Sequence, residues 1–224
     1  SSYGFIPFIT SFTPFASRRI CDQIAISIAY AKQNVKIIGS DPGISAEFNG
    51  GTHMSMEDIG VLRSIPELVI YEPVDVAQFK QALPQIVAYE GPVYIRMFRK
   101  TIDDVFTDAN YKFDLFGADC IQEGTAVTIF CSGIMVQETM KANEILKQEG
   151  IDAEIINIHT IKPIDRDAVV ASAKKTGAVV VAENHNVIGG LTSAVCEVLM
   201  EEYPVPLRAV GVKDRFGQVG KMPF

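Results

Sequence analysis

The sequence predicts an α/β protein built of two three-layer α/β/α domains. Short apolar segments alternate with amphipathic stretches along most of the chain, which is typical of parallel strands joined by crossover helices. The expected strands are continuously apolar, as strands are when helices cover both faces of their sheet. A polar, weakly periodic stretch interrupts the alternation once. We therefore expect a first domain over residues 1–101, a linker over 102–118 that lies against the surface, and a second domain over 119–224.

The first domain is expected to hold a wholly parallel sheet. Its predicted strands are residues 5–10, 35–38, 68–71 and 93–97, and its predicted helices are residues 19–30, 56–65 and 76–88. The first strand is a run of aromatic and aliphatic residues, which is the pattern of a buried strand. Glu57 and Asp58 fall in the first turn of the second helix, where carboxylates favour the helix dipole.

The second domain is expected to hold a mostly parallel sheet. Its predicted strands are residues 126–131, 153–158, 178–182 and 207–210, and its predicted helices are residues 136–148, 165–175 and 190–201. The last helix has the clearest apolar face, because its leucines, valines and alanine recur at helical spacing.

Composition excludes several classes of protein. The chain has 224 residues, 48% of them hydrophobic and 21% charged, with no apolar run long enough to cross a bilayer. A net charge of −7 argues against a nucleic-acid partner, whose phosphates require a basic face. The four cysteines have no C-x-x-C spacing, so we expect buried free thiols in a reducing cytoplasm and no metal site formed by them.

A glycine pair followed by threonine and histidine, at residues 50–53, is the segment with the most evident chemistry. Glycine lets the backbone approach a ligand closely, and histidine exchanges protons near neutral pH. On these residues alone, His53 fits a catalytic loop or a turn in which the backbone satisfies the imidazole.

A series of motifs in a fixed order resembles the transketolases. In the first half these are Ile-Thr-Ser-Phe-Thr-Pro-Phe at 9–15, Gly-Gly-Thr-His at 50–53, Arg-Ser-Ile-Pro at 63–66, Pro-Val-Asp at 73–75 and Gly-Pro-Val-Tyr-Ile-Arg at 91–96. In the second half they are Glu-Asn-His-Asn-Val-Ile-Gly-Gly-Leu at 183–191 and Asp-Arg-Phe-Gly at 214–217. The first half resembles the pyrimidine-binding domain and the second half the C-terminal domain. Together they are most similar to the small, C-terminal subunit of a split transketolase.

The resemblance implies chemistry on thiamine diphosphate, which cleaves a ketose and passes a two-carbon ketol unit to an aldose. It also implies that the cofactor lies between two chains. No Gly-Asp-Gly motif is present, so the diphosphate and a Mg or Ca ion are expected on an N-terminal partner subunit. We expect self-association into a dimer or heterotetramer, sugar phosphates as substrates, and a place in the pentose phosphate part of cytoplasmic carbohydrate metabolism.

The resemblance assigns roles to four residues of the first half. Phe12 and Phe15 would wall the aminopyrimidine, because an aromatic face packs on a flat heterocycle. His53 would lie over the reactive carbon, contact the donor sugar and exchange a proton with its hydroxyl. Arg99 would grip the substrate phosphate through its fork of donors. On sequence alone, Arg99 could equally be a strand-end charge that pairs with acids in the linker.

Two positions depart from the family pattern. Long-chain transketolases carry an acid where this chain has Asn49, and a histidine where it has Asp41. Both positions are expected to contact substrate, and the change of charge puts a pentose phosphate acceptor in doubt. The roles of Arg18 and His185 stay open, although an interface role is favoured for His185, and His159 is expected to be structural.

The resemblance also places the glutamate that activates the cofactor upstream of Ser1, so this chain is expected to be truncated at its amino end and inactive by itself. Two other functions remain as alternatives. One is the β subunit of a 2-oxoacid dehydrogenase complex, which uses the same domain pair. The other is a non-catalytic assembly module.

Overall fold

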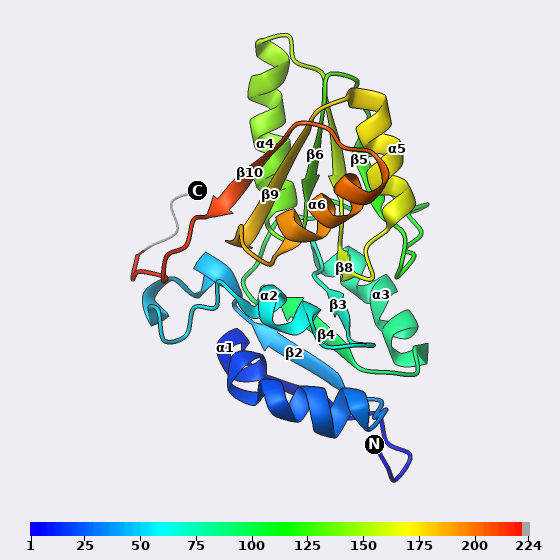
Figure 1. Cartoon of the computed structure of the whole chain (residues 1–224), viewed down its shortest axis with the longest axis vertical. Coiled ribbons are helices and arrows are strands. Elements are labelled where there is room, and N and C mark those ends of the chain that lie inside the picture. Colours follow the sequence, from blue (N-terminus) through cyan, green and yellow to red (C-terminus); the bar gives the residue numbers. More distant parts are fainter. Residues whose placement is uncertain (221–224) are drawn as a thin grey trace.

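The computed structural model describes residues 1–220, which form two five-stranded sheets with helices on both faces of each (Figure 1). The first half contains β1 (Phe8–Phe12), α1 (Thr13–Ala16), the 3₁₀ helix η1 (Arg18–Ile20), the π-helix η2 (Gln23–Tyr30), β2 (Lys36–Ser40), the 3₁₀ helix η3 (Gly43–Asn49), α2 (Asp58–Arg63), β3 (Val69–Tyr71), α3 (Val76–Ala88) and β4 (Val93–Met97). The second half contains β5 (Asp119–Gln122), β6 (Val127–Cys131), α4 (Met135–Gln148), β7 (Ala153–Asn157), β8 (Thr160–Lys162), α5 (Arg166–Thr176), β9 (Val179–Asn186), α6 (Leu191–Glu202) and β10 (Leu207–Val212).

The first sheet has the strand order β1-β2-β4-β3-β8. The first four strands run parallel, as predicted, but β8 pairs antiparallel with β3 and comes from the second half of the chain. The predicted parallel sheet is therefore confirmed for the four strands of the first half, while the antiparallel fifth strand from the second half was not expected. Residues 160–162 show no strand signal because β8 is short and polar at both ends, and because its pairing partner lies far away in the chain.

The first strand also differs from its prediction. It spans Phe8–Phe12 instead of residues 5–10, and it forms an edge with Phe8 and Ile9 exposed. The apolar run therefore marks an uncovered edge of the sheet instead of a buried strand. The next segment folds as η1 and η2, where Ile26 and Tyr30 are exposed as well.

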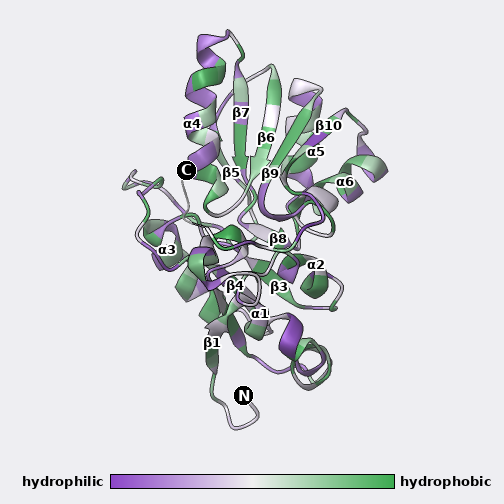
Figure 2. Ribbon diagram, turned by 90° about the vertical axis from the view of Figure 1, so that its left-hand side faces the viewer, coloured by the Kyte–Doolittle hydropathy of each residue, from purple (hydrophilic) through white to green (hydrophobic). Residues whose placement is uncertain are grey.

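The second sheet has the order β10-β9-β6-β7-β5, with β5 antiparallel and the other strands parallel. Helix α4 packs on one face against β6, β7 and β9, whereas α5 and α6 cover the other. In Figure 2, β6 and β7 consist largely of hydrophobic residues, while α4 carries hydrophilic residues along its outer side. This arrangement explains why the strand sequences are apolar without alternation.

The linker is packed more deeply than predicted. Phe113 and Leu115 are buried beside α3 and strands β3 and β4, so residues 102–118 complete one face of the first sheet. The sequence suggested a surface segment because its acids dominate the composition. The buried positions are two isolated apolar residues, which leave no periodic signal.

Candidate active site

The residues predicted to bind cofactor and substrate gather at the carboxyl ends of the parallel strands in the first sheet. Strand β1 ends at Phe12, β2 ends just before Asp41, and β4 ends two residues before Arg99. In open α/β sheets this edge is where ligands bind, because the loops that follow adjacent strands converge there. The second half of the chain packs against the same edge (Figure 1).

Phe12, Phe15 and His53 form one aromatic cluster. The ring centroid of His53 lies 5.1 Å from that of Phe12 and 5.0 Å from that of Phe15, both in edge-to-face geometry. The two phenylalanine rings are 6.2 Å apart and nearly perpendicular. Helix α1 fixes their separation, since the Thr13 hydroxyl donates to the carbonyl of Ser40 at 2.8 Å and ties the helix to β2.

The imidazole of His53 has one ring nitrogen engaged. Its Nδ1 lies 2.9 Å from the hydroxyl oxygen of Thr52. Within residues 1–220, Nε2 has no hydrogen-bond partner, and the ring is partly exposed. The arrangement leaves one nitrogen free to exchange a proton with a bound molecule.

The glycine pair has a structural reason that the sequence did not reveal. Gly50 adopts a φ of 69°, and a Cβ on Gly51 would lie 2.9 Å from the carbonyl oxygen of Gly217. The amides of His53 and Met54 both donate to the carbonyl of Gly50 at 3.0 Å, which closes the turn. The pair therefore lets the C-terminal segment pack on the turn.

Asp41 and Arg99 form an ion pair beside the aromatic cluster. Arg99 Nε lies 2.5 Å from Asp41 Oδ2, and the guanidinium lies 5.2 Å from the ring centroid of Phe12. Asp41 is only 1% exposed and Arg99 is 56% exposed. Burial raises the pKa of the Asp41 carboxyl, while the nearby Arg99 guanidinium opposes that rise. The partner of Arg99 is thus Asp41 and not one of the linker acids considered from the sequence.

Two other sequence candidates lie at the rim. Asn49 is exposed at the end of η3, and its side chain has no hydrogen-bond partner among the described residues. Arg18 forms an ion pair with Glu57, while Arg19 lies with its guanidinium 4.0 Å from the ring centroid of Phe15. Glu57 therefore lies at the rim of the candidate site, and it is also the residue that precedes α2.

The most deeply buried charge near the site is Arg96, whose role the sequence did not indicate. It is fully buried, with Nε 2.8 Å from Asp58 Oδ2 and Nη1 2.5 Å from Glu72 Oε1. Its Nη2 donates to the carbonyl of Asn184, in the second half, at 2.6 Å. Asp58 was predicted as a first-turn helix charge, and that interpretation was incomplete because its carboxylate also accepts from two side chains of β4. The two acids hold the guanidinium charged and raise its pKa, outweighing the effect of burial.

Asn184 joins the second half of the chain to the site loop. Its Nδ2 donates to the carbonyl of Pro42 at 3.0 Å, and its Oδ1 accepts from the amide of Ile44 at 2.9 Å. These bonds fix the start of η3, directly after Asp41. A Cβ on Gly43 would lie 2.2 Å from Asn184 Oδ1, so the close approach requires glycine.

Two other members of the motif at 183–191 make buried hydrogen bonds between elements of the chain. Buried Glu183 accepts from the amides of Leu191 and Thr192 at 2.7 and 3.1 Å, which caps α6. His185 is fully buried; its Nδ1 donates to the carbonyl of Asn186 at 2.6 Å and its Nε2 accepts from the amide of Gly60 at 3.4 Å. His185 therefore holds α2 against β9.

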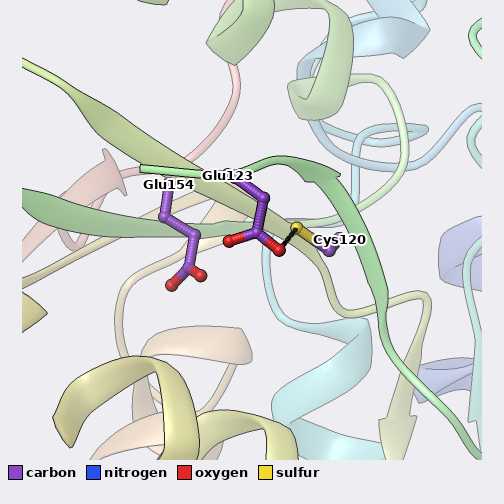
Figure 3. A group of neighbouring side chains, drawn as sticks. All are labelled: Cys120, Glu123 and Glu154. Carbon is purple, nitrogen blue, oxygen red and sulfur yellow. Dashed lines mark hydrogen bonds between the residues drawn. The ribbon is translucent and has the colours of Figure 1, made fainter. Parts of the chain in front are cut away.

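One cluster of potential metal ligands lies far from this site. Cys120, Glu123 and Glu154 converge at the edge of the second sheet (Figure 3). The ammonium group of Lys175 contacts both carboxylates, 2.8 Å from Glu154 Oε1. Burial raises the pKa of the Cys120 thiol to about 11, so it remains protonated at neutral pH. The cluster is an ion pair with a neighbouring thiol. Cys131 alone of the four cysteines is fully buried, and all four are free.

Sequence comparison defines the family. Residues 1–103 match the transketolase pyrimidine-binding domain and residues 117–223 match the transketolase C-terminal domain. The chain belongs to the transketolase family, whose members depend on thiamine diphosphate.

Individual relatives and one solved structure refine this placement. The chain is 57% identical over 220 residues to the 6-deoxy-6-sulfo-D-fructose transketolase subunit SqwH of Clostridium sp. (strain MSTE9), covering 98% of this chain and 68% of the relative. It is 36% identical over 200 residues to one subunit of the apulose-4-phosphate transketolase of Phocaeicola vulgatus, covering 89% and 64%. The structure of a split gene transketolase, an inactive β4 tetramer, superposes with a TM-score of 0.90 at 42% identity, covering 97% of this chain and 69% of that one. The chain thus spans about two thirds of these proteins.

No helix within residues 1–220 has the length and apolar character needed to span a membrane.

Proposed function

We propose that this chain supplies the pyrimidine-binding and C-terminal domains of a two-subunit transketolase. The reaction transfers a two-carbon ketol unit from a ketose to an aldose. The observation that carries the proposal is the cluster of Phe12, Phe15 and His53. It lies beside Arg99, at the carboxyl ends of the parallel strands in the first sheet. Transketolase subunits among the relatives, and a split gene transketolase among the solved structures, support the same function.

The residues of the aromatic cluster are suited to binding the aminopyrimidine of thiamine diphosphate. Thiamine diphosphate, when bound, supplies the carbanion that cleaves and re-forms the carbon–carbon bond next to a carbonyl. Phe15 and Phe12 offer apolar ring surface to its aminopyrimidine and exclude water from it. Arg19 covers part of Phe15, so Phe15 contributes its remaining face and edge.

In this proposal, His53 exchanges a proton with a hydroxyl group of the donor sugar. Its free Nε2 accepts a hydrogen bond from the hydroxyl beside the bond that breaks, and Thr52 fixes the ring through Nδ1. Asn49 contacts a sugar hydroxyl from the rim. Arg99 binds the anionic end group of the sugar, a phosphate or a sulfonate, through donors not used by Asp41.

An N-terminal partner subunit completes the site in this proposal. It supplies the diphosphate-binding residues and a divalent metal ion such as Mg²⁺ or Ca²⁺. The assembled enzyme is a hetero-oligomer, which the subunit names of the relatives support, while the β4 tetramer of the structural neighbour supports self-association of this chain. The chain without this partner is proposed to be inactive.

The test is reconstitution with the N-terminal subunit encoded in the same genome, thiamine diphosphate and Mg²⁺. The donors are fructose 6-phosphate and 6-deoxy-6-sulfofructose, with glyceraldehyde 3-phosphate as acceptor. We expect a four-carbon aldose that keeps the end group of the donor, and no product from the chain alone. Release of carbon dioxide from pyruvate without cleavage of either ketose would favour a 2-oxoacid dehydrogenase subunit instead.

A substitution separates catalysis from assembly. In the reconstituted enzyme, His53→Ala is expected to lower kcat/KM by about 10²–10⁴-fold, because a positioned acid–base group is lost. The oligomer and cofactor affinity should stay as in the wild type, measured by analytical ultracentrifugation and calorimetry. Unchanged turnover with an intact oligomer would make His53 a structural residue and favour a non-catalytic assembly module.

A further inference from the structure

Asp41 places a negative charge where the substrate's anionic end group is expected. The residue lies directly after β2 with a φ of 52°, and its amide donates to the carbonyl of Met97 at 3.0 Å. It is 1% exposed, and one oxygen contacts Arg99 at 2.5 Å while the other, Oδ1, makes no hydrogen bond to any described residue. Arg99 is therefore the group that chiefly balances this buried carboxylate.

Arg99 keeps donors for a second anion. A guanidinium has five N–H donors in a planar fork, so one carboxylate at Nε does not use them all. The side chain is more than half exposed and lies beside the ring of Phe12. An anion that binds to these free donors interacts with a guanidinium whose positive charge is already partly neutralised by Asp41.

The other cations around the cluster are paired in the same way. Arg18 contacts Glu57 and Lys100 contacts Glu47, which leaves Arg19 over the ring of Phe15 as the cation without an acid partner among residues 1–220. Among these four cations, Arg99 is the one whose acid partner, Asp41, is almost wholly buried.

We infer that Asp41 selects a ketose whose end group carries one negative charge, such as a sulfonate, over one that carries two, such as a phosphate. A phosphate monoester holds between about one and a half and two charges at pH 7, whereas a sulfonate holds a single charge. The additional charge is repelled by Asp41, whose carboxylate is only 1% exposed and is therefore less screened by water than a surface charge. This inference rests on the proposed transketolase function and adds a residue that sets its substrate class.

The test compares two ligands that bind but cannot be cleaved. Sorbitol 6-phosphate and 6-deoxy-6-sulfosorbitol lack the carbonyl, so calorimetry on the reconstituted enzyme reports binding without turnover. We expect the wild type to bind the sulfonate at least about tenfold more tightly at pH 7.5. Asp41→Asn keeps the shape and removes the charge, and it should tighten phosphate binding about tenfold more than sulfonate binding. Asp167→Asn, an exposed change in α5, is the matched control and should alter neither.

Each outcome decides the inference. Equal changes in both affinities for Asp41→Asn would show that Asp41 holds Arg99 without sensing ligand charge, and would overturn it. Equal affinity of the wild type for the two ligands would also overturn it. Ketol transfer is measured in parallel: its absence from every ketose, with selective sulfonate binding retained, would refute the proposed function while leaving the charge selection by Asp41 intact.

Discussion

At the scale of single residues, the partly buried Asp119 and the fully buried His159 lie side by side, 3.7 Å apart, and titrate in opposite directions. Asp119 accepts hydrogen bonds from Gln78 Nε2 at 2.9 Å, from Asn157 Nδ2 at 3.1 Å and from the Tyr111 hydroxyl at 3.1 Å. Burial raises the pKa of its carboxyl to about 6 despite these donors. Burial also lowers the pKa of the neighbouring His159 imidazole to about 4.

These shifts act on stability in opposite directions. The folded pKa of Asp119 is raised, so its contribution is present at low pH and is lost as pH rises from about 4 to about 6. The folded pKa of His159 is lowered, so its contribution is present near neutrality and is lost as pH falls from about 6.5 to about 4. The two effects largely cancel in the wild type between these limits.

In Asp119→Asn, the contribution of His159 to the pH dependence of stability should no longer be cancelled. An asparagine can keep the bonds from Gln78 and Asn157 through its oxygen, while its amide donates to the Tyr111 hydroxyl. We expect higher stability than the wild type at pH 7.5, by about 2 kcal/mol, and a steep loss on acidification to pH 4.5 that the wild type lacks. Urea unfolding followed by circular dichroism across this range measures both. Parallel pH profiles for variant and wild type would contradict the assignment of these pKa shifts.

Prediction from sequence at this scale succeeded where a residue belonged to a local motif. Phe12, Phe15 and His53 lie together as the ordered motifs implied, although their roles toward cofactor and sugar remain predictions. Arg96 and Asp58 could not be interpreted from sequence. Their burial results from contacts among α2, β4 and the second half of the chain, and one isolated sequence carries no signal for such a meeting.

At the scale of elements, two helix-capping aspartates fasten the linker. Asp75 caps α3 by accepting from the amide of Gln78 at 2.7 Å, and its second oxygen accepts from the amides of Val105 and Phe106 at 2.6 and 2.8 Å. Asp165 caps α5 through the amide of Ala168 at 3.0 Å. Its second oxygen accepts from the amide of Ala118 at 2.9 Å, at the other end of the linker.

Asp75→Asn should loosen the linker while leaving the helix in place. An asparagine has only one acceptor oxygen. Its NH₂ group must therefore face either the donor amide of the helix or the donor amides of the linker, which are left without an acceptor. We expect a loss of about 1–3 kcal/mol in the free energy of unfolding and faster hydrogen exchange at Val105 and Phe106. Exchange mass spectrometry resolves this segment, with Asp167→Asn, an exposed first-turn acid in α5, as the control. Unchanged exchange in Asp75→Asn would show that the linker holds by its buried phenylalanine and leucine alone.

Helices and strands could be predicted where the sequence pattern that indicates them extends over enough residues. Helices α3, α4 and α6 and the central strands lie close to their expected positions, since each has caps or a sustained apolar face. Strands β5 and β8 were missed because both are short antiparallel additions whose partners are distant in the chain. The burial of β1 was predicted wrongly, because apolar character indicates burial only when something covers the strand.

At the scale of the whole molecule, the two halves share one interior. A single cluster of buried side chains contains Ile37 and Leu62 of the first half together with Phe130, Val195 and Leu199 of the second. β8 adds a hydrogen-bonded strand across the same boundary. The chain should therefore unfold as one cooperative unit in spite of its two sheets.

Arg96 is a buried charge that also joins the two halves, since it donates to the carbonyl of Asn184. Its guanidinium balances Asp58 and Glu72, and Glu72 in turn accepts from the Ser132 hydroxyl of the second half at 2.6 Å. Removing one member of a buried ionic group costs more than removing all of it, because unbalanced charges remain in a medium of low polarity. Arg96→Met should therefore lower the free energy of unfolding by about 3–5 kcal/mol.

A compensated variant separates charge from packing. Adding Asp58→Asn and Glu72→Gln to Arg96→Met removes the unbalanced carboxylates and should restore part of the lost stability. Arg166→Met, which breaks an exposed pair with Glu201 and Glu202, is the matched control and should have little effect. Urea unfolding gives the energies, and hydrogen exchange resolves the two sheets. In Arg96→Met we expect the first sheet to lose protection before the second, whereas both lose it together in the wild type. Simultaneous loss in the variant would mean that the shared apolar interior, and not the ionic network, couples the two domains.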